Sequence, residues 1–241
     1  MMIKERTQVV VLWTVVVVLL FAFTSVAERA PEALPKEGEL TPHFQRMSTY
    51  HKRMDGSVPE GAVLFIGDSI TQGLCVAAVC QHGVNYGIGS DTTAGVIERL
   101  PLYASVERAA AVVLAIGVND LRRRDDQFIR ENLRLLLEQI TPHAPVVVSA
   151  ILPLDERIAS VGADRNKRIA GLNGEIKALA DSFAHCVYVD AGPMLLDEEG
   201  CLAAACHVGD GVHPNTEGYA KWIAVLQAGL KKVRVSEACN K

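Results

Sequence analysis

Ser69 stands where an apolar run ends and a helix is expected to begin. Residues 63–66 (Val-Leu-Phe-Ile) have the length and apolar character of a buried parallel strand, and residues 67–71 (Gly-Asp-Ser-Ile-Thr) follow them directly. A serine at the carboxyl end of such a strand lies at the rim of the sheet, where open α/β folds bind their ligands. A helix that starts there points free N–H groups at the hydroxyl and favours an anion. Ser69 is therefore a candidate nucleophile or, because serine is a favoured N-cap, only a helix cap.

His213 stands in a context suited to a general base. A serine hydroxyl is a weak nucleophile and needs a neutral imidazole to take its proton. Asp210 precedes His213 by three residues, which is close enough to orient the imidazole and stabilise the imidazolium. The run 210–214 (Asp-Gly-Val-His-Pro) could equally be a turn before a helix, because Asp, Gly and Pro are ordinary turn residues. The other six histidines are expected on the surface or in loops: His43, His51, His82, His143, His185 and His207.

Asn119 could donate hydrogen bonds to a developing negative charge. It follows the apolar run 112–116 and the turn residue Gly117, so its amide can point at a carbonyl oxygen that becomes negative in a transition state. Donors of this type are worth about 10²–10³ in rate. The alternative is a helix cap, since Asn and Asp are both good caps, and Asp120 is expected to be structural.

A fourth segment, residues 85–92 (Asn-Tyr-Gly-Ile-Gly-Ser-Asp-Thr), completes an ordered series of motifs. With these four motifs the chain resembles the SGNH (GDSL-type) hydrolase family, as an esterase, lipase or platelet-activating-factor-acetylhydrolase-like member, from about residue 62 to about residue 222. The resemblance implies a serine esterase that forms an acyl-enzyme and needs no metal or organic cofactor. It implies that Ser69, Asp210 and His213 are the catalytic residues.

The resemblance also implies an oxyanion hole made by the side chain of Asn119 and by main-chain N–H groups. In the family one of these comes from a glycine just before an Asp-Thr pair; here that position is Ser90, and Gly89 precedes it. Because the group used is a main-chain N–H, which serine also has, the donor is assigned to Ser90, with Gly89 as the alternative. A side chain here restricts the backbone angles. Asp91 and Thr92 are expected to hold the loop.

Short apolar runs alternate with helical patterns along the chain, and this predicts a parallel sheet with helices on both faces. Apolar residues recur at spacings of three and four over residues 128–140 and 169–183, and a last helix is expected over about 215–230. The resemblance implies an α/β, flavodoxin-like three-layer sandwich with a five-stranded parallel sheet. The expected strands are residues 63–66, 84–86, 112–116, 146–150 and 187–189.

Composition fits a globular domain and limits its ligands. The 241 residues are 49% hydrophobic and 22% charged, which argues against disorder. The net charge of -4 gives no electrostatic case for binding nucleic acid. With 5% aromatic residues there is little sign of a platform for sugars, which favours small soluble acyl esters. Acetyl groups on polysaccharides, lysophospholipids and thioesters stay open as substrates.

The N-terminus has the layout of a secretory signal peptide. Lys4 and Arg6 precede the apolar run 9–23, and Ser-Val-Ala at 25–27 fits a cleavage site after Ala27. The alternative for residues 1–27 is an uncleaved membrane anchor, although the run is shorter than the ~20 apolar residues that a spanning helix needs. Either way we expect a secreted or periplasmic domain. Residues 28–60 are predicted to be a linker with a short helix near 44–54, and residues 61–235 the hydrolase domain.

The six cysteines permit disulfides in an exported chain. Cys75 with Cys80, and Cys201 with Cys206, share one spacing and are the natural local pairs, although spacing alone does not fix the connectivity. A zinc site is the competing interpretation, but the flanking His and Cys spacing does not follow a zinc-finger pattern.

Two further features leave functional alternatives open. The run Arg122-Arg123-Arg124 follows Asn119 closely and is either a solvated surface or an electrostatic lip that favours anionic substrates. The glycines at 87–89 match neither phosphate-loop nor dinucleotide spacing. A competing class of function is a catalytically silent, exported binding protein on a degenerate hydrolase fold.

Overall fold

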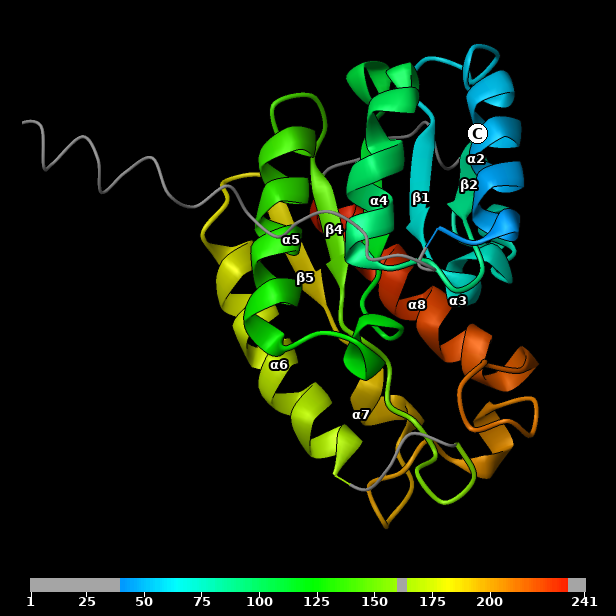
Figure 1. The fold of residues 1–241 in the computed structure, drawn as a ribbon, viewed down its shortest axis with the longest axis vertical. Helices are drawn as coiled ribbons and strands as arrows, with labels where there is room; N and C mark the ends of the chain where they lie inside the picture. The colour runs from blue at the N-terminus through cyan, green and yellow to red at the C-terminus, as the bar shows by residue number, and fades with distance from the viewer. Residues whose placement is uncertain (1–39, 160–163, 234–241) are drawn as a thin grey trace, which may run out of the picture. The chain divides into compact units, whose positions relative to one another are not determined.

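The computed structural model describes residues 40–159 and 164–233, which form an α/β fold around a sheet of five parallel strands (Figure 1). The strand order is β2-β1-β3-β4-β5, and every neighbouring pair is parallel. This is the flavodoxin-like order, so the predicted fold class is confirmed. The strands are β1 (Val63–Gly67), β2 (Gly83–Gly87), β3 (Ala111–Ala115), β4 (Val146–Ser149) and β5 (Cys186–Val189).

Helices cover both faces of the sheet. Packed on one face are α4 (Thr93–Arg99), α5 (Asp126–Ile140) and α6 (Arg165–Asp181). On the other face lie α3 (Ser69–Gln72), α7 (Gly192–Leu195) and α8 (Thr216–Lys232). Strand β1 is buried throughout: Leu64 and Ile66 enter the first core, and Val63 and Phe65 the second. A strand covered on both faces reads as a continuous apolar run, which is why the sequence showed it clearly.

Helix α2 (Pro42–Asp55) extends the domain towards the N-terminus. Thr41 caps it by accepting a hydrogen bond from the N–H of Phe44. At its other end the buried carboxylate of Asp55 accepts hydrogen bonds from the hydroxyl of Tyr86 (2.6 Å) and the N–H of Ser105 (3.1 Å). The short helix predicted near 44–54 is therefore α2, and it packs against the folded domain, whereas the sequence assigned it to a linker before a domain that starts at residue 61.

Two of the long helices, α5 and α8, begin at side-chain caps, whereas Asp164 at the start of α6 makes no side-chain cap. Asp125 accepts the N–H of Phe128 at the start of α5 (2.8 Å), and Asn215 accepts two N–H groups at the start of α8. Short 3-10 helices connect the main elements: η1 (Val76–Ala78), η2 (Leu100–Leu102), η3 (Ala104–Arg108), η4 (Asp120–Arg122) and η5 (Ala204–Cys206). Over the described ranges, no helix has the length and apolar character needed to cross a membrane. The signal sequence or anchor predicted at 1–27 lies outside these ranges.

The local cysteine pairs predicted from spacing are wrong. Cys75, Cys201 and Cys206 are free thiols, and Cys80 is disulfide-bonded but not to Cys75. Cys186, on the edge strand β5, is also free. Equal spacing in the chain says nothing about whether two side chains point at one another, and bond geometry requires that they do.

Candidate active site

Ser69 is the first residue of α3, directly beyond the carboxyl end of β1. The helix cap is Asp68, whose carboxylate accepts the N–H of Ile70 (2.9 Å). The hydroxyl of Ser69 is therefore not used as a cap. Glycine lets β2 pass close behind the short helix, because a Cβ on Gly87 would lie 2.2 Å from the backbone nitrogen of Gln72. Burial, which outweighs the hydrogen bond from Ile70, raises the pKa of Asp68 to about 7.

Ser69, His213 and Asp210 form one hydrogen-bonded row. Nε2 of His213 lies 2.8 Å from Oγ of Ser69, and Nδ1 lies 2.6 Å from Oδ2 of Asp210. Ser69 and His213 lie 144 positions apart in the chain, and Asp210 precedes His213 by three. The row lies at the carboxyl edge of the sheet, partly open to solvent, with the side chains of His213 and Asp210 about two-fifths exposed.

Asp210 is held as an anion. Its other oxygen accepts the N–H groups of Val212 and His213, both at 2.9 Å. Burial pushes the pKa of Asp210 upward, but the hydrogen bonds from the side chain and N–H of His213 and from Val212 outweigh it and hold the pKa at about 2. The carboxylate therefore fixes the ring of His213 with Nδ1 protonated and Nε2 free to accept a proton.

His207 shapes the loop that carries Asp210 and His213. Its Nδ1 accepts the N–H groups of Gly209 (3.0 Å) and Gly211 (3.2 Å), and its side chain is buried. His51 is also buried, 3.3 Å from the hydroxyl of Tyr103, and burial lowers its pKa to about 4. The expectation that the remaining histidines lie on the surface or in loops is therefore wrong for His51, which is buried in helix α2. His207 does lie in a loop, but its side chain is buried.

The loop after β2 distinguishes the two candidate N–H donors. Gly89 already donates its N–H to Oε1 of Gln72 at 2.5 Å. The N–H groups of Ser69 and Ser90 donate to no other group in the described part of the chain. Ser90 has a φ of 65°, in the left-handed region that favours glycine. This backbone angle explains why a glycine suits the position. Because the N–H of Gly89 is already used by Gln72, Ser90 has the N–H that remains available.

Asn119 lies beside the same loop. It precedes η4 without making a side-chain cap, and its Nδ2 donates to the carbonyl oxygen of Asp91 (2.9 Å). That bond ties Asn119 to the residue directly after Ser90. Asp120 is buried and accepts the N–H and the hydroxyl of Thr93, which agrees with the structural role expected for it.

Arg99 is a buried support of this site that sequence reasoning missed. Its guanidinium donates to Oδ2 of Asp91 (2.7 Å) and to the carbonyl oxygens of Tyr86 (2.8 Å) and Gly67 (3.0 Å). It thereby joins the ends of β1 and β2 to the Ser90 loop. The only sequence signal was its place on α4, seven residues after Thr92, the residue that caps this helix.

A cavity of about 260 Å³ opens beside Ser69 and His213. Ser90 and Asn119 line it as well, so the structure brings the hydroxyl, the imidazole and both predicted donors to one space. Two arginines complete its polar wall, Arg122 from η4 and Arg165 from α6. The apolar part of the wall consists of Val118, Leu121, Leu154 and Val212.

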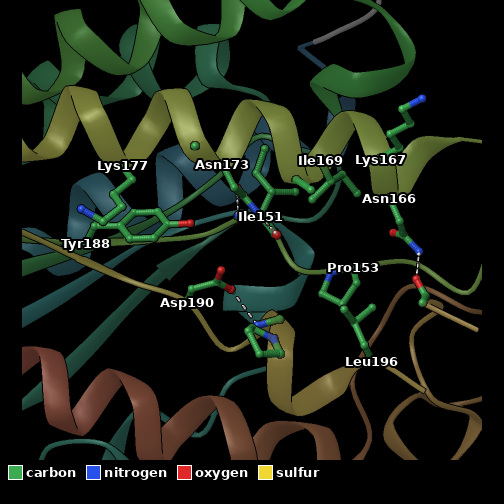
Figure 2. Close-up of a pocket in the computed structure, with 15 residues that line it drawn as sticks. Ile151, Pro153, Asn166, Lys167, Ile169, Asn173, Lys177, Tyr188, Asp190 and Leu196 are labelled. Carbon is green, nitrogen blue, oxygen red and sulfur yellow. Dashed lines mark hydrogen bonds between the residues drawn. The ribbon is translucent and has the colours of Figure 1, made fainter. Parts of the chain in front are cut away.

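A second cavity, of about 540 Å³, lies between α6, β5 and α7 (Figure 2). Ile151, Ile169 and Leu196 give it apolar walls, and Asp190 and Lys177 stand at its sides. No Ser, Thr, Cys or His belongs to its lining in the described residues. Nor do the described residues contain a group of three or more His, Cys, Asp or Glu side chains arranged to hold a metal ion.

A serine, a histidine and an aspartate in hydrogen-bond contact at the carboxyl edge of a five-stranded parallel sheet define a class of serine-hydrolase folds. The chain belongs to the GDSL-like Lipase/Acylhydrolase family, whose sequence pattern matches residues 65–221. This is a family of hydrolases that act on carboxylic esters.

Relatives of known name support this assignment. The chain is 26% identical over 204 residues to the human platelet-activating factor acetylhydrolase IB subunit alpha2, which covers 79% of this chain and 86% of that protein. It is 28% identical over 169 residues to the bovine subunit alpha1, and the match covers 65% of this chain and 70% of that protein. A GDSL-like lipase from Bacteroides thetaiotaomicron has the same fold, with a TM-score of 0.68 at 21% identity over 77% of this chain and 97% of that one.

Proposed function

We propose that this protein is an exported serine esterase in which Ser69, His213 and Asp210 form the catalytic triad. The observation that carries the proposal is the continuous row of hydrogen bonds from Ser69 to Asp210, at 2.8 and 2.6 Å, on the wall of a cavity. A serine hydroxyl becomes a nucleophile when a neutral imidazole accepts its proton, and the carboxylate holds that imidazole in place.

The reaction proceeds in two halves. Oγ of Ser69 bonds to the ester carbonyl carbon while Nε2 of His213 takes the hydroxyl proton, and a tetrahedral oxyanion forms. The bond to the alcohol oxygen then breaks, and His213 protonates that oxygen. Water repeats the sequence on the acyl-enzyme: His213 takes its proton, the acyl–Oγ bond breaks, and the proton returns to Ser69. Asp210 stabilises the imidazolium in both halves.

The oxyanion is held by the N–H groups of Ser69 and Ser90 and by the amide of Asn119. The N–H of Gly89 is excluded because Gln72 occupies it. Preorganised donors of this kind act where charge develops and need no rearrangement during the reaction. The bond from Asn119 to the carbonyl of Asp91 keeps two of the three donors at a fixed separation.

A short acyl group fits the cavity better than a long one. A space of about 260 Å³ lies below the usual range of about 300–1,000 Å³ for sites of drug-sized ligands. The relatives at 26–28% identity are named acetylhydrolases. We therefore propose acetyl and other short acyl esters as substrates.

Export is the part of the proposal that rests on the sequence alone. Lys4 and Arg6, the apolar run 9–23 and the small residues at 25–27 favour cleavage after Ala27. Intact-mass analysis of the protein recovered from outside the cytoplasm tests this. A mature chain beginning at Glu28 supports cleavage, and a chain that retains residues 1–27 supports the membrane anchor.

Hydrolysis of p-nitrophenyl esters from acetate to palmitate tests the activity, with protein lacking residues 1–27 beside Ser69→Ala. We expect turnover that is greatest for the shortest acyl chains and that is lost in Ser69→Ala. If folded wild-type protein matches Ser69→Ala on every ester, the chemistry assigned to Ser69 is wrong. The competing function, a catalytically silent binding protein, would then be favoured.

A further inference from the structure

The wall of the small cavity is cationic. Arg122 and Arg165 line it together with Ser69 and His213, and no Asp or Glu belongs to its lining in the described residues. The carboxylate of Asp210 stands behind His213, which it contacts at 2.6 Å. A ligand in this cavity therefore meets two guanidinium groups on the same side of the sheet as the reactive hydroxyl.

Both arginines are attached to fixed parts of the site. Arg122 is the last residue of η4, three positions after Asn119, and the buried side chain of Asp120 anchors this turn to Thr93. Arg165 is the first residue of α6, and its guanidinium donates to the carbonyl oxygen of Leu121. The two charges thus converge on one turn, although 43 residues separate them in the chain.

The acidic groups nearby are already engaged. Arg122 and Arg165 also line an adjoining groove with Asp125 and Asp126. Asp125 caps α5, and Asp126 accepts a hydrogen bond from Nε of Arg168 at 2.7 Å. Arg122 is exposed and forms no ion pair or side-chain hydrogen bond with the described residues.

A guanidinium is suited to a carboxylate or phosphate group, because its planar fork can donate two parallel hydrogen bonds to two oxygens. Charges on a partly enclosed wall also raise the local concentration of an oppositely charged ligand. A neutral ester would leave this part of the wall unused.

We propose that Arg122 and Arg165 form a subsite for an anionic group, and that the preferred substrate is a short-chain ester that also carries a carboxylate, phosphate or sulfate. This inference rests on the proposed function, because it names the substrate class of the same site. The arginine run is then a part of the site and not only a solvated surface.

Binding of uncleaved esters to full-length Ser69→Ala protein tests the subsite without relying on turnover. Calorimetry compares 4-acetoxybenzoate with 4-acetoxybenzamide, which place a carboxylate or a neutral amide on the alcohol side. Monoethyl adipate and its amide do the same on the acyl side. In at least one pair we expect the carboxylate to bind about tenfold more tightly, as one charge-assisted hydrogen bond would give. The preference weakens as salt is added.

Matched variants assign the preference to the cavity wall. Adding Arg122→Gln to Ser69→Ala removes the preference, whereas adding Arg123→Gln leaves it, because Arg123 lines the adjoining groove but not the cavity. Equal binding of acid and amide in both pairs overturns the inference, and so does a preference that survives Arg122→Gln. If the wild-type protein hydrolyses none of the esters, the proposed esterase function is refuted instead. The failure of the anionic subsite and the failure of the esterase function therefore give different results.

Discussion

The cavity beside Ser69 and the cavity beside α6 and α7 differ in size and in chemistry, and the smaller one carries the reactive groups. The cavity beside α6 and α7 measures about 540 Å³ and has mainly apolar walls (Figure 2). The one beside Ser69 measures about 260 Å³ and is lined by a hydroxyl, an imidazole, an amide and two guanidinium groups. Volume reflects how loosely helices pack at the edge strand β5, whereas reactivity requires polar groups that converge on one point.

The cause of the difference is the topology of the sheet. Parallel strands bring their carboxyl ends to one edge, so the loops after β1, β2 and β3 place Ser69, Ser90 and Asn119 side by side. The larger cavity lies farther along the sheet, against α6 and the last strand. Its polar side chains bond mainly to nearby backbone, as Asn173 does to both the N–H and the carbonyl of Ile151.

The largest expected effect is the difference in kcat/KM between a substitution at Ser69 and one in the larger cavity. Ser69→Ala should lower kcat/KM for p-nitrophenyl acetate by roughly 10⁴-fold or more, because the nucleophile is lost. Ala170→Trp, which fills the larger cavity from α6, should change kcat/KM by less than about threefold. Steady-state kinetics on both folded variants measures this. A severe loss in Ala170→Trp with an active Ser69→Ala would reverse the comparison.

Asp210→Asn should lower kcat by roughly 10⁴-fold, because an amide neither stabilises the imidazolium nor selects the tautomer. The pKa of Asp210 is lowered to about 2, so this group stays ionised between pH 5 and 8. Loss of wild-type activity towards pH 5 therefore reports protonation of the imidazole, which must be neutral to act as a base. A kcat/KM profile that is flat from pH 5 to 8 in the wild type would contradict the role of His213 as the base.

Asn119→Ala should lower kcat by about 10²–10³-fold with a much smaller change in KM, because the lost hydrogen bond forms in the transition state. The amide also bonds to Asp91, so thermal unfolding serves as the control. A loss of activity that matches a collapse of stability would assign Asn119 a structural role only.

Ser90→Gly should have the smallest effect. Glycine keeps the main-chain N–H and removes the strain of a φ of 65°, so kcat should stay within about threefold. The free energy of unfolding should rise by about 0.5–1 kcal/mol, the difference between the left-handed penalty and the greater freedom of glycine when unfolded. Denaturant unfolding measures this, and destabilisation would mean that the serine side chain supports the loop.

The sequence predicted the parts of the molecule that depend on local pattern. The central strands β1, β3 and β4 appear as apolar runs because they are buried along most of their length. Ser69, Asn119 and His213 could be singled out because each lies in a short motif at the end of an element. Their convergence followed from the parallel sheet that the alternation of strands and helices predicts.

The features that sequence reasoning missed depend on contacts between distant residues. Asp55 binds the hydroxyl of Tyr86 and thereby fixes α2 to the domain, across 31 positions. The sequence assigned the donor to Ser90 with Gly89 as the alternative, but it did not reveal that the N–H of Gly89 is used by Gln72, 17 residues away. Arg99 is buried because four groups accept hydrogen bonds from it, and no periodic pattern encodes such a set of partners.

The most direct test of the small cavity as the active site is covalent labelling with a fluorophosphonate, followed by peptide mass spectrometry. This reagent needs an activated serine. We predict one adduct, on Ser69, that is absent from His213→Ala although that variant is folded. An intact wild-type protein that takes up no label, or that is labelled on a serine outside this cavity, would contradict the triad of Ser69, His213 and Asp210.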